Sequence, residues 1–406
     1  MTHDVIILGG GPAALFSAAA CAREGLSVLV LGGTDHHWTN TYGGWVDELA
    51  SVGLTGWIRA QWPDAEVVTA GQPKRLGRAY ATLHGEAIRE HLLSDAAFEV
   101  KWVQAVGPCT DDGTTFTVTD ADGQAHMGRA VLDGTGAARV AVGGEAPTAF
   151  QSAYGVIAHT DWAHDASIMG FMDWTPAPSV DAQTSSAPTF LYTLPLGDGR
   201  IFFEETSLRR QQPLPYAVLK ARLHARLDAM GVSVEAWGAE EHCCFPMNIE
   251  RPGRDTPVVG LGLAGGFVHP ATGYQFVRSV AAAPLVARAL RSGLDDGLAG
   301  LALAQRAWDT VWPRERRARH DLMELGAQQL ETFEHQALER FFEAFFTMPS
   351  EHWRAYTAVQ GSLGAAMTAM ASVFARVNMR TRWKLMKSGR NLPPVLLEAA
   401  GLAGTP

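Results

Sequence analysis

The feature that most constrains the fold is the N-terminal stretch DVIILGGGPAALFSAAACAREGLSVLVLGG, residues 4–33. An apolar strand, a glycine turn, an alanine-rich helix and a second apolar strand follow one another there, as in a βαβ unit that binds a dinucleotide. Gly9 supplies the tight turn, Gly11 lets the backbone approach a pyrophosphate, and Ala14 allows close helix packing. A merely structural glycine turn is the alternative. The residues predicted to contact the dinucleotide here are Gly9, Gly11, Pro12, Ala13 and Ala14.

The second strand of this unit lacks the acidic residue that commonly binds the ribose. Leu31 is followed by Gly32 and Gly33, and Asp35 arrives late. The sequence therefore leaves the ribose contact open.

Composition and charge narrow the classes of function. The chain has 406 residues, 47% of them hydrophobic, which is enough for a full core. Its net charge of −9 argues against a nucleic acid partner, which requires a basic face. The four cysteines show no C-x-x-C spacing, so we expect a reducing compartment and interpret the adjacent Cys243 and Cys244 as ordinary thiols rather than a redox pair. No basic leader precedes the first strand, which predicts a cytoplasmic protein.

The order of the segments predicts an α/β protein with three parts. Residues 1–150 and 243–300 are expected to form a discontinuous Rossmann-type domain that includes a small meander of short strands. Residues 151–242 alternate strands with proline-rich turns and predict a second, antiparallel β-sheet lobe for the substrate. Residues 301–406 have a helical pattern.

Two further glycine-rich turns are expected to lie against the bound dinucleotide. The first, Asp133 to Gly136, ends a strand and can pass close to a cofactor. The second, GLGLAGGFVHPATGY at 260–274, leads to a helix start whose free N–H groups favour negative charge. The residues added to the cofactor site from these turns are Asp133, Gly136, Gly265, Gly273 and Tyr274.

Two adjacent glutamates interrupt the apolar segment RIFFEETSL, residues 200–208. With PTFLYTLPL (188–196) and the intervening Gly-Asp-Gly turn, it predicts a β-hairpin. Strand alternation places Glu204 on one face and Glu205 on the other. A glutamate in an apolar pocket stays protonated near neutral pH, so one of the two can donate a proton while the other joins a structural network. Two solvent-facing glutamates on an edge strand are the alternative.

Five motifs, in the same order, resemble the lycopene cyclases of plants and cyanobacteria. They are WTNTYGGWVDEL (38–49), AYGVIA (153–158), FMDW (171–174), PTFLYTLPL with RIFFEETSL (188–208) and AGGFVHPATGY (264–274). The resemblance implies a flavoprotein fold of the p-hydroxybenzoate hydroxylase class, with reduced FAD as the active form and NADPH or NADH as reductant. It also implies a lycopene β-cyclase of carotenoid biosynthesis, which closes the acyclic ψ-ends of lycopene into β-ionone rings without net redox change, giving γ-carotene, β-carotene or both.

The resemblance also assigns roles to the acidic residues. Glu204 matches the glutamate that the family is thought to use as the key acid or base: a proton is added to a terminal double bond, a neighbouring double bond attacks the tertiary cation, and a proton is lost. Asp173 is the expected catalytic partner of Glu204, with a turn acid as the alternative. Glu205 is expected to hold the strand or its neighbours.

A carbocation requires a dry site with electron-rich walls. Tyr42, Trp174, Phe202 and His269 are therefore expected to contact the substrate, and Trp45 the cofactor. Aromatic residues belong to cores more often than to such walls, so only some of them are expected to line the site. No metal site is predicted.

The sequence departs from the family pattern at a few positions. Phe203 replaces a usual leucine, and Gly44 replaces a larger residue. The stretch GLGLAGG lacks the aspartate with which many flavin hydroxylases hold the ribityl chain.

Lycopene dissolves in the bilayer, so peripheral contact with membrane lipid is expected. Phe341, Phe342, Phe345 and Phe346 form an aromatic patch at i,i+4 spacing. A basic run that can meet anionic headgroups consists of Arg376, Arg380, Arg382, Lys384, Lys387 and Arg390. A core helix and a solvated face are the respective alternatives. Residues 355–375 are uncharged but too polar to predict a spanning helix.

Two other functions compete with cyclisation. One is an FAD-dependent oxidoreductase, a hydroxylase or prenyl-chain reductase, acting on an isoprenoid. The other is a carrier that binds isoprenoid chains on a Rossmann scaffold without catalysis.

Overall fold

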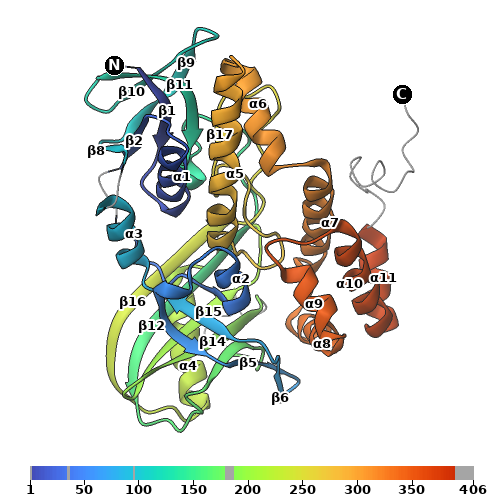
Figure 1. Ribbon diagram of the computed structural model, residues 1–406. Coiled ribbons are helices and arrows are strands. Elements are labelled where there is room, and N and C mark those ends of the chain that lie inside the picture. Colours follow the sequence, from blue (N-terminus) through green and yellow to red (C-terminus); the bar gives the residue numbers. More distant parts are fainter. Residues whose placement is uncertain (1, 34–36, 95–96, 179–186, 389–406) are drawn as a thin grey trace.

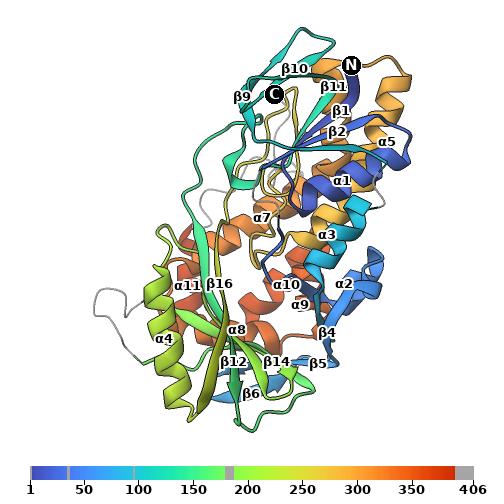
Figure 2. The same ribbon diagram turned by 90° about the vertical axis from the view of Figure 1, so that its left-hand side faces the viewer.

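The computed structural model describes residues 2–33, 37–94, 97–178 and 187–388. Figures 1 and 2 show two sheets at opposite ends of the molecule, with a group of C-terminal helices beside the second sheet. The predicted architecture, an α/β nucleotide-binding part, a second sheet and a helical C-terminal part, is confirmed in outline.

The first sheet has the order β8-β2-β1-β11-β10-β9, and β17 pairs with β11 as well. Its strands are β1 (Thr2–Leu8), β2 (Val28–Gly32), β8 (Glu99–Trp102), β9 (Ala105–Asp111), β10 (Phe116–Asp120), β11 (Ala125–Asp133) and β17 (Val259–Gly260). The pairs formed by β8, β2, β1, β11 and β17 are parallel, whereas β9, β10 and β11 form the predicted antiparallel meander. The apolar residues of β1 and β2 are buried on both faces, as parallel sheets require.

Helices cover this sheet. Those beside it are α1 (Pro12–Arg23), α3 (Gly85–Ser94), α5 (Phe276–Asp295) and α6 (Gly300–Val311). Helix α1 packs against α5, and both bury small side chains such as Ala14, Ala18 and Ala283. Because alanine is short, the two helix backbones can approach closely above the sheet.

The second sheet has the order β16-β12-β15-β14-β13-β5-β6. Its strands are β5 (Asp64–Thr69), β6 (Gln72–Arg75), β12 (Phe150–Thr160), β13 (Ile168–Asp173), β14 (Thr189–Gly197), β15 (Arg200–Ser207) and β16 (Val234–Pro246). Every pair is antiparallel except β13 with β5. This differs from the predicted division of the chain, because β5 and β6 lie within 1–150 and β16 runs past 242. The predicted boundaries missed these strands because they followed chain order, whereas pairing joins distant segments.

The predicted hairpin is confirmed as β14 and β15. Its turn, Gly197, Asp198 and Gly199, has positive φ at all three residues, which explains the two glycines. Helix α4 (Tyr216–Ala229) covers one face of the sheet, where Leu219 and Leu223 pack with Phe203 and Leu191. The opposite face is left for the site described below.

The remaining elements connect and flank these sheets. A small sheet is formed by β3 (Gly43–Trp45), β7 (Tyr80–Leu83) and β4 (Ile58–Trp62), accompanied by α2 (Val46–Ser51) and the 3-10 turns η1 (Thr55–Trp57) and η2 (Gly136–Ala138). The C-terminal helices are α7 (Arg314–Leu330), α8 (His335–Thr347), α9 (Ser350–Thr357), α10 (Leu363–Arg376) and α11 (Met379–Ser388). They confirm the helical prediction up to residue 388; residues 389–406, Arg390 included, lie outside the described residues.

Candidate active site

The N-terminal glycine turn forms one end of a cavity of about 540 Å³. Gly11, Pro12 and Ala13 line it, and helix α1 begins at Pro12 without a side-chain cap on its free N–H groups. No protein atom lies within 4 Å of where a Cβ on Gly11 would stand. This open space beside a helix N-terminus suits a pyrophosphate.

The other residues of the motif support the turn from behind. Gly9 has φ +101°, and a Cβ there would lie 2.5 Å from the carbonyl oxygen of Gly134. The side chain of Ala14 packs against Gly134, where an added Cβ would approach it to 2.9 Å. Gly9 and Ala14 thus shape the cradle without lining it.

The later glycine turns divide between cavity wall and support. Gly136, Gly273 and Tyr274 line the cavity. Gly265 does not: a Cβ on it would meet the carbonyl oxygen of Gly260 at 2.4 Å, so its role is close backbone packing. Asp133 is buried outside the cavity, and its carboxylate accepts hydrogen bonds from the backbone N–H groups of Thr135, Ala141 and Val142. The structure thus places Asp133 in a loop network, away from a ligand.

Glu204 of β15 lines the same cavity as the glycine turn. Its carboxyl oxygen Oε1 accepts a hydrogen bond of 2.6 Å from the Thr206 hydroxyl. Its side chain is half-buried and lines the cavity. Burial, together with the negative charge of Glu241, raises the pKa of Glu204 to about 7. A large fraction of this carboxyl is therefore protonated at neutral pH, unlike an ordinary glutamate.

Glu205 points to the opposite face of the sheet, as strand alternation predicts. It is fully buried and forms a two-bonded ion pair with Arg226 of α4, at 2.8 Å to Nε and 2.9 Å to Nη2. The two glutamates thus have separate surroundings, one a cavity and the other a buried ion pair that attaches α4 to the sheet.

Glu241 of β16 is a second acidic residue in the cavity, and the sequence analysis missed it. In the sheet register Glu204 is opposite Gly155, and Gly155 is opposite Glu241, so the two glutamates flank one glycine position. Both oxygens of Glu241 accept the backbone N–H of Thr41, at 2.9 and 3.0 Å, and Oε2 also accepts the Thr41 hydroxyl at 2.6 Å. The available signal was the pair Glu240-Glu241, which repeats the pattern of Glu204-Glu205.

Tyrosines form the wall beside Glu204. Tyr192 is its register partner on β14, and the Tyr274 hydroxyl donates to the Tyr80 hydroxyl at 3.1 Å. Burial raises the pKa of Tyr80 to about 12, so this hydroxyl stays neutral at physiological pH. The wall offers hydroxyl groups without charge.

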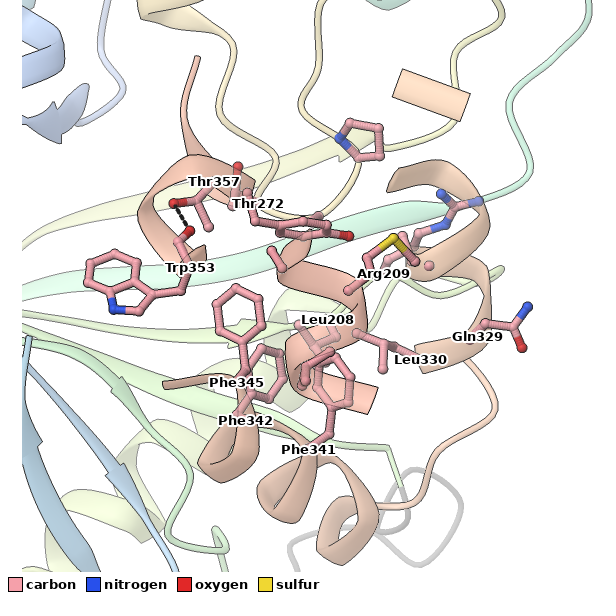
Figure 3. Close-up of a pocket in the computed structure, with 18 of the residues that line it drawn as sticks. Leu208, Arg209, Thr272, Gln329, Leu330, Phe341, Phe342, Phe345, Trp353 and Thr357 are labelled. Carbon is pink, nitrogen blue, oxygen red and sulfur yellow. Dashed lines mark hydrogen bonds between the residues drawn. The ribbon is translucent and has the colours of Figure 1, made fainter. Parts of the chain in front are cut away.

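A second, apolar cavity of about 460 Å³ adjoins the first (Figure 3). In Figure 3, Phe341, Phe342 and Phe345 project from α8 toward Leu208 and Leu330. Aromatic rings dominate its walls, among them Trp45, Phe171, Phe341, Phe345, Trp353 and Phe374. The phenylalanine patch predicted on this helix is confirmed, with Phe341 and Phe345 stacked at 6.3 Å, but it faces this cavity and the core instead of the exterior.

The two cavities share a wall. Gln151, Tyr192, Thr272 and Tyr274 line both of them. A long apolar molecule in the aromatic cavity would therefore end at the compartment that contains Glu204.

Several residues predicted for the site lie elsewhere. Asp173 shares a sheet face with Glu205, through Leu191, and its carboxylate accepts the backbone N–H of Thr175 at 2.8 Å. The structure therefore does not bring Asp173 to Glu204, and the turn interpretation fits instead, because a one-residue offset on a strand reverses the face.

Some of the predicted substrate and cofactor residues line a cavity, and others are buried behind its wall. Tyr42 and Phe202 line the cavity with Glu204. Trp45 lines the aromatic cavity, not the cofactor side. Trp174 is fully buried and stacks on Phe342 at 4.8 Å, behind the cavity wall. His269 is buried outside both cavities, with Nε2 3.2 Å from the carbonyl oxygen of Tyr356.

Two absences hold for the part of the chain that the structure describes. No group of histidine, cysteine and acidic side chains there could hold a metal ion. No helix there has the length and apolarity needed to cross a bilayer.

Comparison with known proteins gives one family. A family model described as "Lycopene cyclase protein" matches residues 4–382. The lycopene beta cyclase of Synechococcus elongatus is 34% identical over 402 residues, covering 96% of this chain and 97% of that protein. The chloroplastic lycopene beta cyclase of Arabidopsis thaliana is 33% identical over 402 residues, covering 95% of this chain and 80% of that protein.

The chain belongs to the lycopene cyclase family. It is an enzyme of this carotenoid-biosynthesis family, as the resemblance of its motifs implied.

Solved structures establish the fold class of this family member. A geranylgeranyl bacteriochlorophyll reductase-like protein from Thermoplasma acidophilum superimposes with a TM-score of 0.68 at 13% identity, covering 99% of both chains. The p-nitrophenol 4-monooxygenase PnpA of Pseudomonas putida superimposes with a TM-score of 0.56 at 14% identity, covering 96% of this chain and 99% of that one. The predicted flavoprotein fold of the p-hydroxybenzoate hydroxylase class is confirmed.

Proposed function

We propose that this lycopene cyclase family member is an FAD-dependent lycopene β-cyclase that starts ring closure with the proton of Glu204. The observation that carries the proposal is the position of that carboxyl. It lines the glycine-lined cavity beside Tyr192, which lines both cavities, and its pKa is raised to about 7, so much of it is protonated at neutral pH.

FAD fits the glycine-lined cavity. Gly11, Pro12 and Ala13 would hold its pyrophosphate at the start of α1, and Gly136 and Gly273 would face its other parts. When bound in its reduced form, FAD would supply an electron-rich ring system that favours positive charge. NADPH or NADH would serve as the reductant that maintains this form.

The cyclisation needs one acid and one base, and the carboxyl of Glu204 can serve as both. Its O–H bond breaks as a C–H bond forms at the terminal double bond, leaving a tertiary cation and a carboxylate. The next double bond attacks the cation and closes the ring. A proton then leaves the ring carbon next to the new cationic centre and returns to the carboxylate of Glu204. The enzyme thus regains its proton, and no electrons are exchanged.

The aromatic cavity suits the rest of the substrate. Phenylalanine and tryptophan rings there can pack against a polyene chain. Their faces favour positive charge that develops near the shared wall. Few charged groups line it, which limits water that would trap the cation as an alcohol. The proposed substrate is lycopene or another acyclic carotenoid, and the proposed ring is of the β type.

Access from the membrane completes the proposal. Exposed apolar side chains gather on α10 and α11: Met367 is 52% exposed, Met379 61% and Trp383 66%. Phe374 and Leu385 of the same two helices line the aromatic cavity. We propose that this helical end contacts the lipid surface peripherally, so the substrate can enter between the helices.

The test is expression in bacterial cells that accumulate lycopene, with the pigments separated by mass and absorbance. The wild type should give a product isomeric with lycopene with a shortened chromophore. Glu204→Gln, which keeps the shape but not the titratable proton, should lower product formation at least about 100-fold. Glu240→Gln is the matched control, because Glu240 pairs with Lys220 at the surface.

Two outcomes would contradict the proposal. A product heavier by oxygen or hydrogen would mean a hydroxylase or reductase. Unchanged lycopene with folded, flavin-loaded protein would mean a different substrate.

A further inference from the structure

We propose that Glu241 is a positioning residue for the proton: its negative charge, on the other side of the Gly155 position from Glu204, favours the protonated form of Glu204. This inference rests on the proposed function only for its effect on catalysis. The two side chains and their hydrogen bonds carry the rest.

The sheet places the two glutamates on either side of a position that has no side chain of its own. Gly155 occupies the middle position of the row that runs from Glu204 to Glu241. The ring of Phe202 lies over it, since a Cβ on Gly155 would meet that ring at 2.4 Å. An apolar ring between two acidic groups lowers the local dielectric and strengthens their repulsion.

The hydrogen bonds are unequal, which decides where the negative charge resides. Glu241 accepts two donors from Thr41: the backbone N–H, which contacts both carboxylate oxygens, and the hydroxyl. These hydrogen bonds offset part of the rise in pKa that burial causes at Glu241. Glu204 receives one hydroxyl, from Thr206. Two close carboxyls cannot both ionise freely, so the proton stays on the group with fewer donors.

No nearby cation cancels this repulsion. Among the described residues, no lysine or arginine lines this cavity. Glu48, at its edge, already pairs with Arg78 at 3.2 Å. The other titratable groups whose fields reach the two glutamates are Tyr42, Tyr80, Tyr192 and Cys243, and burial raises the pKa of each, so all are neutral near pH 7.

Glu240 provides an internal control. It precedes Glu241 on β16 but points to the other face, where Lys220 binds it at 2.6 Å. Removing the charge of Glu240 changes the net charge of the protein by the same amount without changing the field in the cavity.

The experiment is an infrared titration of the flavin-loaded protein without substrate. The carbonyl stretch of a protonated carboxyl is assigned to Glu204 by its loss in Glu204→Gln. In Glu241→Gln the midpoint of this band should fall by about 1 pH unit, since the repelling charge is gone. In Glu240→Gln it should not move. The high-pH limb of cyclisation activity should move down with the band.

A midpoint that stays unchanged in Glu241→Gln would overturn the proposal. Glutamine still accepts from Thr41, so the substitution removes the charge while keeping a contact; Glu241→Met, which lacks that contact, must give the same shift if charge is the cause. A purely structural Glu241 would instead lower flavin content and melting temperature with the band in place. Because the titration uses no lycopene, its failure is distinct from failure of the cyclase assay.

Discussion

The two cavities that share Tyr274 have walls of different composition. The first is walled in part by backbone, at Gly11, Gly136 and Gly273, and its acidic residues are Glu48, Glu204 and Glu241. The second is walled by aromatic side chains from the sheet and the C-terminal helices. In the proposed function this difference separates two tasks: the first region would bind the charged cofactor and move a proton, and the second would accept a hydrocarbon.

The largest expected effect is on cofactor binding alone. Gly11→Val should abolish flavin binding while the protein folds, because its side chain enters space that is empty of protein atoms. Gly56→Val is the control, since Gly56 also has open surroundings but does not line the cavity. Flavin absorbance per protein and the far-UV spectrum measure both. Normal flavin content in Gly11→Val would refute the assignment of this cavity.

The buried ion pair behind the cavity should determine stability instead. Arg226→Met leaves the carboxylate of Glu205 buried without its partner, and should lower the free energy of unfolding by about 3–5 kcal/mol in denaturant titrations. Adding Glu205→Leu should recover much of this loss, because no unpaired charge remains. A double variant as unstable as the single one would mean that the pair is not the cause.

Thr272 lies on the wall that both cavities share, and it can be enlarged without changing the glycine turn, the glutamates or the phenylalanines. Thr272→Phe should reduce cyclisation at least about tenfold with flavin content retained, because the added ring takes up space at the wall that both cavities share. Thr272→Ser should behave like the wild type. Pigment analysis measures cyclisation, and flavin absorbance measures cofactor content. If Thr272→Phe lost cyclisation and flavin content equally, the result would argue against two compartments.

The contribution of Glu204 to the free energy of unfolding should depend on pH. Its folded pKa of about 7 lies above the ordinary 4.5, so its carboxyl favours the folded state at low pH and disfavours it as pH rises through 7. Glu204→Gln should therefore unfold less readily than wild type at pH 8, by up to about 3 kcal/mol, and equally at pH 4. The opposite trend would mean an ionised Glu204.

The smallest expected effect concerns the hydroxyl pair of the wall. Tyr274→Phe removes the hydrogen bond to Tyr80 and should cost about 1 kcal/mol of unfolding free energy. Flavin content should remain, since the ring keeps its place. A loss beyond 3 kcal/mol would show that the hydroxyl supports more than one bond.

Some features of the two cavities could be predicted from the sequence, and others could not. The glycine cradle and the opposite faces of Glu204 and Glu205 follow from local rules, turn geometry and strand alternation, so they were predicted. Glu241 and the misplaced Asp173 depend on which distant strands pair, and in which register. The phenylalanines of α8 were predicted as a patch, but only tertiary packing shows that they face inward.

The most direct test of proton-initiated ring closure is cyclisation by the purified protein in heavy water. With reduced FAD and lycopene, the account predicts one deuterium in the product for each ring formed, no net oxidation of the flavin, and no product from Glu204→Gln. Rings that contain no deuterium, or products formed with stoichiometric flavin oxidation, would contradict it.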